Sequence, residues 1–284
     1  MKIRYLYLIA IIVCFSCKKN SPIEGVAIPL SDTLIKNISY GNNVANVFDL
    51  YLPGNRNADT KIIILIHGGG WSGGDKNELS FLAQGWKERG FAVANINYRL
   101  SPQSNDNYKM QLDDINLLQN YLNEKASLYS YNSTNMYITG HSAGAHLALS
   151  FAYTRNPSGQ IKAAGGMASP TDLVAGATEN FGIVGTTTIA PYLGAPLSEA
   201  TRNIYENASP IYHVTKSTIP TILFQGNIDI IVAPNQSVSL DNKLEENGVP
   251  EKLMMYPGIF HDWWQNGDLV KNTLDETEQW FKKY

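Results

Sequence analysis

Residues 136–147 read Met-Tyr-Ile-Thr-Gly-His-Ser-Ala-Gly-Ala-His-Leu. The first four residues have the pattern of a short buried strand, and an apolar stretch typical of a helix follows over residues 142–153. A tight turn from strand to helix strains the backbone at its centre and leaves no room for flanking side chains. Because Gly140 and Gly144 flank Ser142, we expect a strand, a sharp turn and a helix here.

The alternation of strand and helix continues in both directions from this turn. Apolar runs rich in β-branched residues predict buried strands, and one alternating segment predicts a half-exposed strand. The expected strands are residues 44–52, 61–66, 91–97, 136–139, 161–168, 219–224 and 252–256. The expected helices are residues 78–89, 112–122, 142–153, 236–246 and 269–281. This order predicts an α/β fold with a mostly parallel sheet, helices on both faces, and ligands at the carboxyl ends of the strands.

Two glycine-rich motifs predict acyl-transfer chemistry. Ser142 is the expected nucleophile, because the helix after it directs its N-terminal amides at developing negative charge. Residues 67–71 read His-Gly-Gly-Gly-Trp directly after a predicted strand, and such a loop can turn backbone amides toward a tetrahedral oxyanion. A phosphate-binding loop is disfavoured, since no Lys followed by Ser or Thr comes after the glycines. The expected oxyanion donors are the amides of Gly69, Gly70 and Ala143, with Gly68 and Trp71 as alternatives.

A serine hydroxyl needs a base to take its proton, and the base needs a carboxylate to orient it. The order along the chain in folds of this kind is serine, acid, histidine. His261, in the loop after the last predicted strand, is the expected base. Asp229, directly after the strand at 219–224, is the expected acid, and Asp172 is the alternative one strand earlier. Asp262 adjoins the base, so its side chain is expected to point away.

The composition is that of an ordinary globular protein. The chain has 284 residues, of which 44% are hydrophobic and 17% are charged, so it can bury a sizeable core. A formal net charge of −3 gives no electrostatic reason to expect a nucleic-acid partner. The sequence shows no metal-binding cluster at ligand spacing, and serine acyl transfer needs no cofactor, so none is expected.

The first 17 residues have the pattern of an export signal. A basic start is followed by a short apolar run, and Ser16 before Cys17 resembles the processing site of bacterial lipoproteins. We expect lipidation at Cys17, with a plain cleaved signal as the alternative. Residues 18–31 then form a tether, and residues 32–284 form a single catalytic domain. The chain is therefore expected to be an exported lipoprotein anchored at the membrane, facing the periplasm or cell surface of a Gram-negative bacterium.

Several motifs also carry a family resemblance. Residues 67–76 contain the His-Gly-Gly-Gly-Trp motif and then Gly-Asp-Lys, residues 97–102 read Asn-Tyr-Arg-Leu-Ser-Pro, and residues 140–147 contain the serine turn. Together with residues 208–214 and the loop at Asp229, they resemble the hormone-sensitive-lipase-like branch of the α/β-hydrolases. Within it, the chain is most similar to bacterial carboxylesterases of the acetyl-xylan or feruloyl esterase type, with kynurenine formamidase as a cousin.

The resemblance implies an α/β-hydrolase fold and a serine carboxylesterase acting on short-chain or aryl esters. The larger lipase-like members carry an N-terminal cap that a chain of 284 residues is too short to hold, so no large cap domain is expected. Acetyl or feruloyl groups on plant-type polysaccharides suit an exported enzyme of this kind. An arylformamidase would use the same residues, and a non-catalytic binding module is the alternative from another class. Such modules usually lose the serine or the histidine, and this chain has both.

Other residues are expected around the cleft. Residues 181–196 should form its rim. The candidates for stacking on the substrate are Trp71 and Trp263, with Tyr192 and Trp264 beside them, although packing is the commoner role of such aromatics. Gln225 and His141 depart from the usual family residues at their positions. The Arg99 and Asp114 side chains are expected either to support the site or to lie at the surface.

Overall fold

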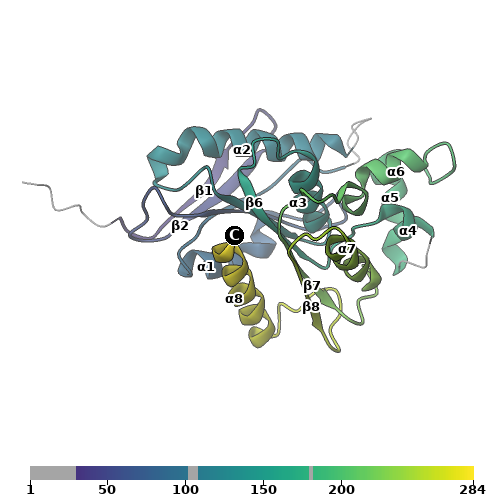
Figure 1. The fold of residues 1–284 in the computed structure, drawn as a ribbon. Coiled ribbons are helices and arrows are strands. Elements are labelled where there is room, and N and C mark those ends of the chain that lie inside the picture. Colours follow the sequence, from purple (N-terminus) through teal and green to yellow (C-terminus); the bar gives the residue numbers. More distant parts are fainter. Residues whose placement is uncertain (1–29, 102–107, 179–181) are drawn as a thin grey trace, which may run out of the picture.

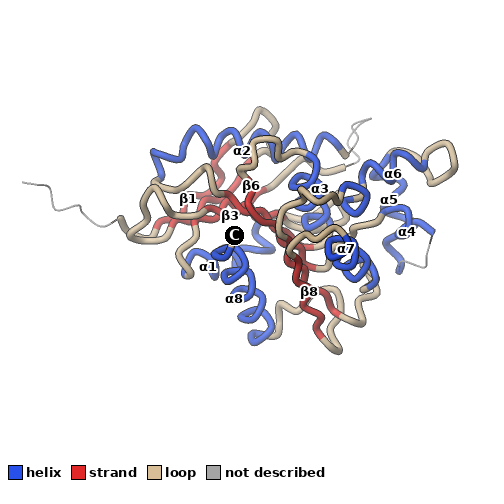
Figure 2. Tube along the Cα trace, in the orientation of Figure 1, coloured by secondary structure: helices blue, strands red, loops and turns tan. Residues whose placement is uncertain are grey.

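The structure is a computed structural model that describes residues 30–101, 108–178 and 182–284. The predicted export signal, Cys17 and nearly all of the predicted tether lie outside the described residues. The described chain forms one eight-stranded sheet in the order β1-β2-β4-β3-β5-β6-β7-β8 (Figures 1 and 2). The strands are β1 (Thr33–Ser39), β2 (Val47–Leu52), β3 (Ile62–Ile66), β4 (Ala92–Ile96), β5 (Met136–His141), β6 (Ile161–Met167), β7 (Thr221–Gly226) and β8 (Glu251–Tyr256).

The sheet is mostly parallel, as the sequence predicts. β4, β3, β5, β6, β7 and β8 pair in parallel, whereas β2 pairs antiparallel with both β1 and β4. The expected strand at 44–52 begins only at Val47, because asparagine side chains form a turn before it. Asn43 Oδ1 accepts from Ala45 N at 2.9 Å, and Asn46 Oδ1 accepts from Asn43 N at 3.2 Å.

Helices cover both faces of the sheet. The helical elements are η1 (Lys76–Leu79), α1 (Ser80–Glu88), α2 (Lys109–Tyr129), α3 (Ala143–Thr154), α4 (Leu173–Thr178), α5 (Gly182–Leu193), α6 (Arg202–Ala208), η2 (Pro210–His213), α7 (Asn235–Glu246) and α8 (Gly267–Lys283). Apolar residues of α2, α3 and α7 form one core cluster, and those of α1 and α8 form the other. Figure 2 shows α1 and α8 on one side of the sheet and α2 on the other.

The central strand β3 explains why two clusters form. All five of its residues are fully buried. Ile62, Ile64 and Ile66 belong to the cluster of α2, α3 and α7, whereas Ile63 and Leu65 belong to the cluster of α1 and α8. Successive side chains of a strand point to opposite faces, so a continuous apolar run is required where both faces are covered.

The segment between β6 and β7 is an insertion of short helices, α4, α5, α6 and η2. It lies at one end of the molecule in Figure 1, beyond α3. Residue 181, the start of the predicted cleft rim, lies outside the described residues, and the rest of that rim corresponds to α5 and the turn after it. Among the described helices, none is both long enough and apolar enough to cross a membrane.

Candidate active site

Ser142 lies at the predicted sharp turn between β5 and α3. Its backbone has φ 54° and ψ −122°, a strained conformation for a residue with a side chain, and its amide donates to Met167 O at 2.8 Å. A side chain at Gly144 would clash with the carbonyl oxygen of Ile66, and one at Gly140 would clash with the backbone of Gly144. The glycines therefore allow α3 to start directly against β3, and the predicted strand, turn and helix are confirmed.

The glycine loop after β3 lies against this turn. A Cβ atom added at Gly68 would be 3.2 Å from Ser142 Cβ. Gly69, Gly70 and Trp71 all have positive φ angles, of 107°, 57° and 63°. Within the described part of the chain, the amides of Gly69, Gly70 and Ala143 donate to no backbone or side-chain acceptor. The three expected oxyanion donors therefore belong to two segments that meet at Ser142, with their N–H groups not engaged elsewhere among the described residues.

Buried polar contacts hold the far end of the glycine loop. Lys76 Nζ lies 2.9 Å from Asp49 Oδ1, and the two side chains are 4% and 1% exposed. Asp75 caps η1 in a capping box with Glu78, and Asp75 Oδ2 also accepts from Asn97 Nδ2 at 2.7 Å. The Gly-Asp-Lys part of the motif therefore ties the glycine loop to β2 and to the end of β4.

Trp71 connects the glycine loop to the helix of the nucleophile. Its indole Nε1 donates to His146 Nδ1 at 3.1 Å, and His146 Nε2 in turn lies 2.7 Å from Ala208 O. A carbonyl can only accept, so the proton of the His146 ring is assigned to Nε2. Burial lowers the pKa of His146 to about 4, which keeps the ring neutral. Trp71 also stacks on Tyr192 of α5 with ring centroids 4.3 Å apart.

The predicted acid and base contact each other. His261 Nδ1 lies 2.8 Å from Asp229 Oδ2. The other carboxylate oxygen, Oδ1, accepts from the amides of Ile231 and Val232 at 2.8 and 2.9 Å. Burial alone would raise the pKa of Asp229, but the hydrogen bond and charge of His261 and the two amides outweigh it, so its pKa is lowered. Asp229 is therefore held as a carboxylate beside the His261 ring.

Gln225 supports the same carboxylate, which the sequence did not lead us to expect. Its Nε2 donates to Asp229 Oδ2 at 3.0 Å, and its Oε1 accepts from Ser237 Oγ at 2.8 Å. In the sequence, Gln225 stood out only because it departs from the usual family residue. That departure did not show that its side chain points toward Asp229.

The alternative acids lie elsewhere. Asp172 accepts from the amides of Val174 and Ala175, both at 3.0 Å, and so caps α4. Asp262 is exposed. Neither has a hydrogen bond to His261 among the described residues, so Asp229 is the carboxylate that the fold places against this histidine.

The base loop reaches the serine turn through His141. His141 Nε2 lies 3.1 Å from His261 O, and the two ring centroids are 4.9 Å apart. Within the described chain, no hydrogen bond joins Ser142 Oγ to the His261 ring, whose side chain is 16% exposed. Such contacts are often long in ligand-free sites and tighten when a substrate binds. Ser142, Asp229 and His261 thus lie at the carboxyl ends of β5, β7 and β8, and His141 joins the serine turn to the base loop.

Two of the tryptophans expected to stack on a substrate are buried. Trp71 and Trp263 are each 2% exposed. Trp263 donates from Nε1 to Thr273 Oγ1 at 2.9 Å and packs edge-on against Tyr256. This burial leaves neither ring a face for a ligand, so it favours packing over the stacking role. Trp264, which follows Trp263 in the base loop, is half-buried, and its ring centroid lies 4.9 Å from that of His141.

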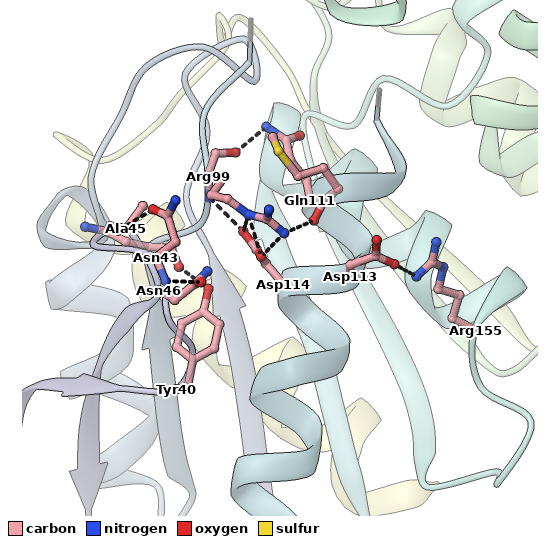
Figure 3. A network of polar contacts seen from close by, with 11 residues as sticks. Tyr40, Asn43, Ala45, Asn46, Arg99, Gln111, Asp113, Asp114 and Arg155 are labelled. Carbon is pink, nitrogen blue, oxygen red and sulfur yellow. Dashed lines mark hydrogen bonds and ion pairs between the residues drawn. The ribbon is translucent and has the colours of Figure 1, made fainter. Parts of the chain in front are cut away.

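Arg99 and Asp114 form a supporting network rather than a surface pair. Arg99 Nη2 donates to Asp114 Oδ1 at 2.6 Å, and the Asp114 side chain is fully buried. Gln111 Nε2 bridges the carbonyls of Trp71 and Arg99 at 2.9 and 2.8 Å. Figure 3 shows Arg99 between the loop at Tyr40 and the helix that carries Gln111 and Asp114. The network thus fixes the chain after β4 beside the glycine loop.

Among the described residues, no group of His, Cys, Asp and Glu side chains could hold a metal ion.

The sheet topology, the strained serine and the glycine loop define an α/β-hydrolase of the esterase type. The chain belongs to the BD-FAE family, which matches residues 48–244. This membership confirms the fold class and the esterase-type resemblance drawn from the sequence motifs.

Two individual relatives have sequence identities below 30% to this chain. The chain is 27% identical over 259 residues to a probable isoprenylcysteine alpha-carbonyl methylesterase of Arabidopsis thaliana, covering 85% of this chain and 53% of the plant protein. It is 28% identical over 240 residues to the kynurenine formamidase of Salmo salar, covering 81% and 71% of the two chains. The chain thus spans about half the length of the plant methylesterase.

Solved structures share the fold. A truncated carbohydrate esterase from gut microbiota has a TM-score of 0.75 at 21% identity, covering 88% of this chain and 97% of the other. Esterase B from Lactobacillus Rhamnosis has a TM-score of 0.75 at 21% identity, covering 89% and 87%. At these identities the likeness supports the fold alone.

Proposed function

We propose that this protein is a serine carboxylesterase that hydrolyses short-chain or aryl carboxylic esters with Ser142, His261 and Asp229. The observation that carries the proposal is the 2.8 Å contact between His261 and Asp229, in a loop that touches the residue next to the strained serine. A buried carboxylate beside a histidine, next to a serine on a strand-to-helix turn, is the arrangement that activates a hydroxyl for attack.

In the proposed reaction, Ser142 Oγ attacks the ester carbonyl carbon while His261 Nε2 takes the hydroxyl proton. The amides of Gly69, Gly70 and Ala143 stabilise the resulting oxyanion. The bond to the alcohol oxygen then breaks, and the alcohol leaves with the proton from His261. Water, deprotonated by His261, cleaves the acyl-serine ester and restores the free hydroxyl. No cofactor takes part in this scheme.

The proposed substrates are acetyl or feruloyl esters on plant-type polysaccharides. This choice of substrate extends the motif resemblance to acetyl-xylan and feruloyl esterases, and it is compatible with the fold that the chain shares with a carbohydrate esterase from gut microbiota. The predicted export signal and lipid anchor at Cys17 would place the enzyme outside the cytoplasm, where such polymers are found.

Metabolic labelling with palmitate, beside the Cys17→Ser variant, tests the predicted lipid anchor. We expect label on the wild type and none on the variant. Equal labelling of both would exclude Cys17 as the anchor.

The first test is hydrolysis of p-nitrophenyl esters of increasing chain length by wild type and Ser142→Ala. Loss of the nucleophile should lower kcat by at least about 10⁴-fold, with acetate preferred over long chains. Equal turnover by the variant would reject Ser142 as the nucleophile. Release of acetate or ferulate from acylated xylan then tests the substrate class, and activity on long-chain esters alone would reject it.

A second candidate is arylformamidase activity. The observation that favours it is the 28% identity to the salmon kynurenine formamidase over 71% of that protein. The same serine, acid and base would cleave the C–N bond of an aryl formamide. Turnover of N-formylkynurenine at a kcat/KM above that of all tested esters would select this function. Folded wild-type protein inactive on esters and on formamides would favour the binding module.

A further inference from the structure

His141 lies directly before Ser142, yet its side chain contacts the opposite side of the site. It is the last residue of β5 and is 9% exposed. Its Nε2 lies 3.1 Å from the backbone oxygen of His261, and its ring lies 4.9 Å from both the His261 and the Trp264 rings. One side chain thus connects the serine turn to the loop that carries the base.

The ring of His141 acts as a hydrogen-bond donor in this contact. The His261 carbonyl oxygen can only accept, so the proton is assigned to His141 Nε2. Burial, followed by the charge that His261 acquires when protonated, lowers the pKa of His141 to about 3. The ring therefore stays neutral and adds no second positive charge beside His261.

The two tryptophans of the base loop bind it to helices away from the serine turn, since Trp263 Nε1 donates to Thr273 Oγ1 of α8 at 2.9 Å and the Trp264 ring packs edge-on against Phe81 of α1 at 5.3 Å. Asp229 orients the His261 ring through Nδ1 but itself belongs to the neighbouring edge loop after β7. That loop and the base loop are joined to each other, since Ile228 N donates to Ile259 O at 3.1 Å. Gly226 lets them pack closely, because a side chain there would clash with the carbonyls of residues 259 and 260. These contacts hold the two edge loops together, and the contact from His141 ties them to the nucleophile.

We infer that His141 is a positioning residue, whose Nε2–H bond to the His261 carbonyl sets the distance between Ser142 Oγ and the His261 ring. The inference rests on the proposed serine-hydrolase function. His141 touches neither the ester nor the transferred proton, so it acts through His261 alone. Misplacing a reacting group by about 1 Å can cost about 100-fold in rate, so the loss of one such bond has a measurable effect on catalysis.

Two substitutions of similar size separate the hydrogen bond from packing. In His141→Gln, the amide Nε2 lies the same number of bonds from Cβ as the imidazole Nε2 and can donate to the same carbonyl. In His141→Leu, the volume is filled but the donor is lost. On p-nitrophenyl acetate, we expect His141→Leu to lower kcat by about 10- to 100-fold with KM nearly unchanged, and His141→Gln to recover most of it. Equal kcat in both folded variants overturns the inference.

A measurement that needs no activity keeps the inference testable if the wild type hydrolyses no ester. In protein labelled with ¹⁵N-histidine, the His141 Nε2–H proton should exchange slowly with water, because it is buried and hydrogen-bonded. The signal should persist in Ser142→Ala and be absent in His141→Gln. A wild type without turnover but with this slow proton rejects the esterase proposal and retains the contact. Fast exchange of this proton in the wild type rejects the contact itself.

Discussion

Ser142 and the glycine loop follow the central strands β5 and β3, whereas Asp229 and His261 follow β7 and β8 at one edge of the sheet. Every residue of β3 is fully buried, but five of the six residues of β8 are only partly buried. The loops beside the acid and base also expose large apolar side chains, with Ile230 at 66% and Phe260 at 58%. The two sides of one site therefore have different physical support.

The central side depends on the protein interior, and the edge side depends on a few specific hydrogen bonds. The glycine loop is held by a buried ion pair and by the Trp71–His146 contact. The base is held by Asp229 and by His141. We therefore expect substitutions on the edge side to lower activity in a folded protein, and substitutions under the glycine loop to lower stability as well.

After the loss of the nucleophile itself, the largest effect is expected on the edge side, from Asp229→Asn. An amide cannot serve as the charged acceptor that keeps the proton of His261 on Nδ1, so kcat should fall by about 10³- to 10⁴-fold. The melting temperature should change little by comparison. Asp172→Asn is the matched control, since Asp172 caps α4 and has no hydrogen bond to His261 among the described residues. If kcat falls further in Asp172→Asn than in Asp229→Asn, Asp229 is not the acid and Asp172 is.

Lys76→Met tests the central side. The change leaves Asp49 buried and charged without its partner, so the free energy of unfolding should fall by about 3–5 kcal/mol. Lys87→Met is the control, because Lys87 pairs with Asp32, whose side chain is 62% exposed, and that loss should be much smaller. Urea unfolding of both variants measures the difference. Equal losses would mean that burial does not distinguish the two pairs.

Trp71→Phe tests the link between the glycine loop and the nucleophile helix. The ring that stacks on Tyr192 is kept in part, but His146 Nδ1 loses its donor, at a cost of about 1–3 kcal/mol in stability. Since the loop is also loosened, kcat on p-nitrophenyl acetate should fall by about 10-fold. Trp280→Phe is a control, because Trp280 Nε1 has no hydrogen-bond partner to lose within the part of the chain that the structure describes. Unchanged kcat in Trp71→Phe would mean that the Trp71–His146 hydrogen bond does not contribute to catalysis.

The smallest effect is expected from Asp241→Asn, in α7 on the edge side. Burial and then the neighbouring carboxylates Glu251 and Glu245 raise the pKa of Asp241 from 3.8 to about 6. A raised carboxyl pKa means that stability is full below pH 3.8 and is lost as the pH rises through about 6. The variant should therefore be more stable at pH 8, by less than about 1 kcal/mol because the site is partly exposed, and equal to wild type at pH 4. A gain of the same size at both pH values would contradict this.

The strands that the sequence predicted best are those in the centre of the sheet. Strands such as β3 carry continuous β-branched runs because both faces are covered, and that pattern is visible without a structure. β1 was not predicted, because its residues are partly or fully exposed and its pairing with β2 supplies most of the order. α2 extends from Lys109 to Tyr129, beyond the predicted 112–122, and ends where Ser130 takes a left-handed conformation. Local periodicity marks the apolar face of a helix more clearly than its ends.

The candidate residues divide in the same way. Ser142 and the glycine loop were predicted because their backbone demands particular residues at adjacent positions, which the sequence displays directly. The sequence placed Asp229 and His261 after strands of the sheet and favoured Asp229 as the acid, but Asp172 stayed an alternative because it also follows a parallel strand. The burial of Trp71 and Trp263 was also beyond the sequence, because the neighbours that cover both rings come from distant segments.

The sequence by itself determined the order of strands and helices, the strained turn at Ser142 and the glycines that approach it, because each depends on residues close together in the chain. Only the tertiary structure decided which carboxylate meets His261, that Gln225 holds the same carboxylate, and that His141 reaches the His261 backbone. Those contacts join loops after different strands, and their geometry depends on how the strands stack in the sheet rather than on any local pattern.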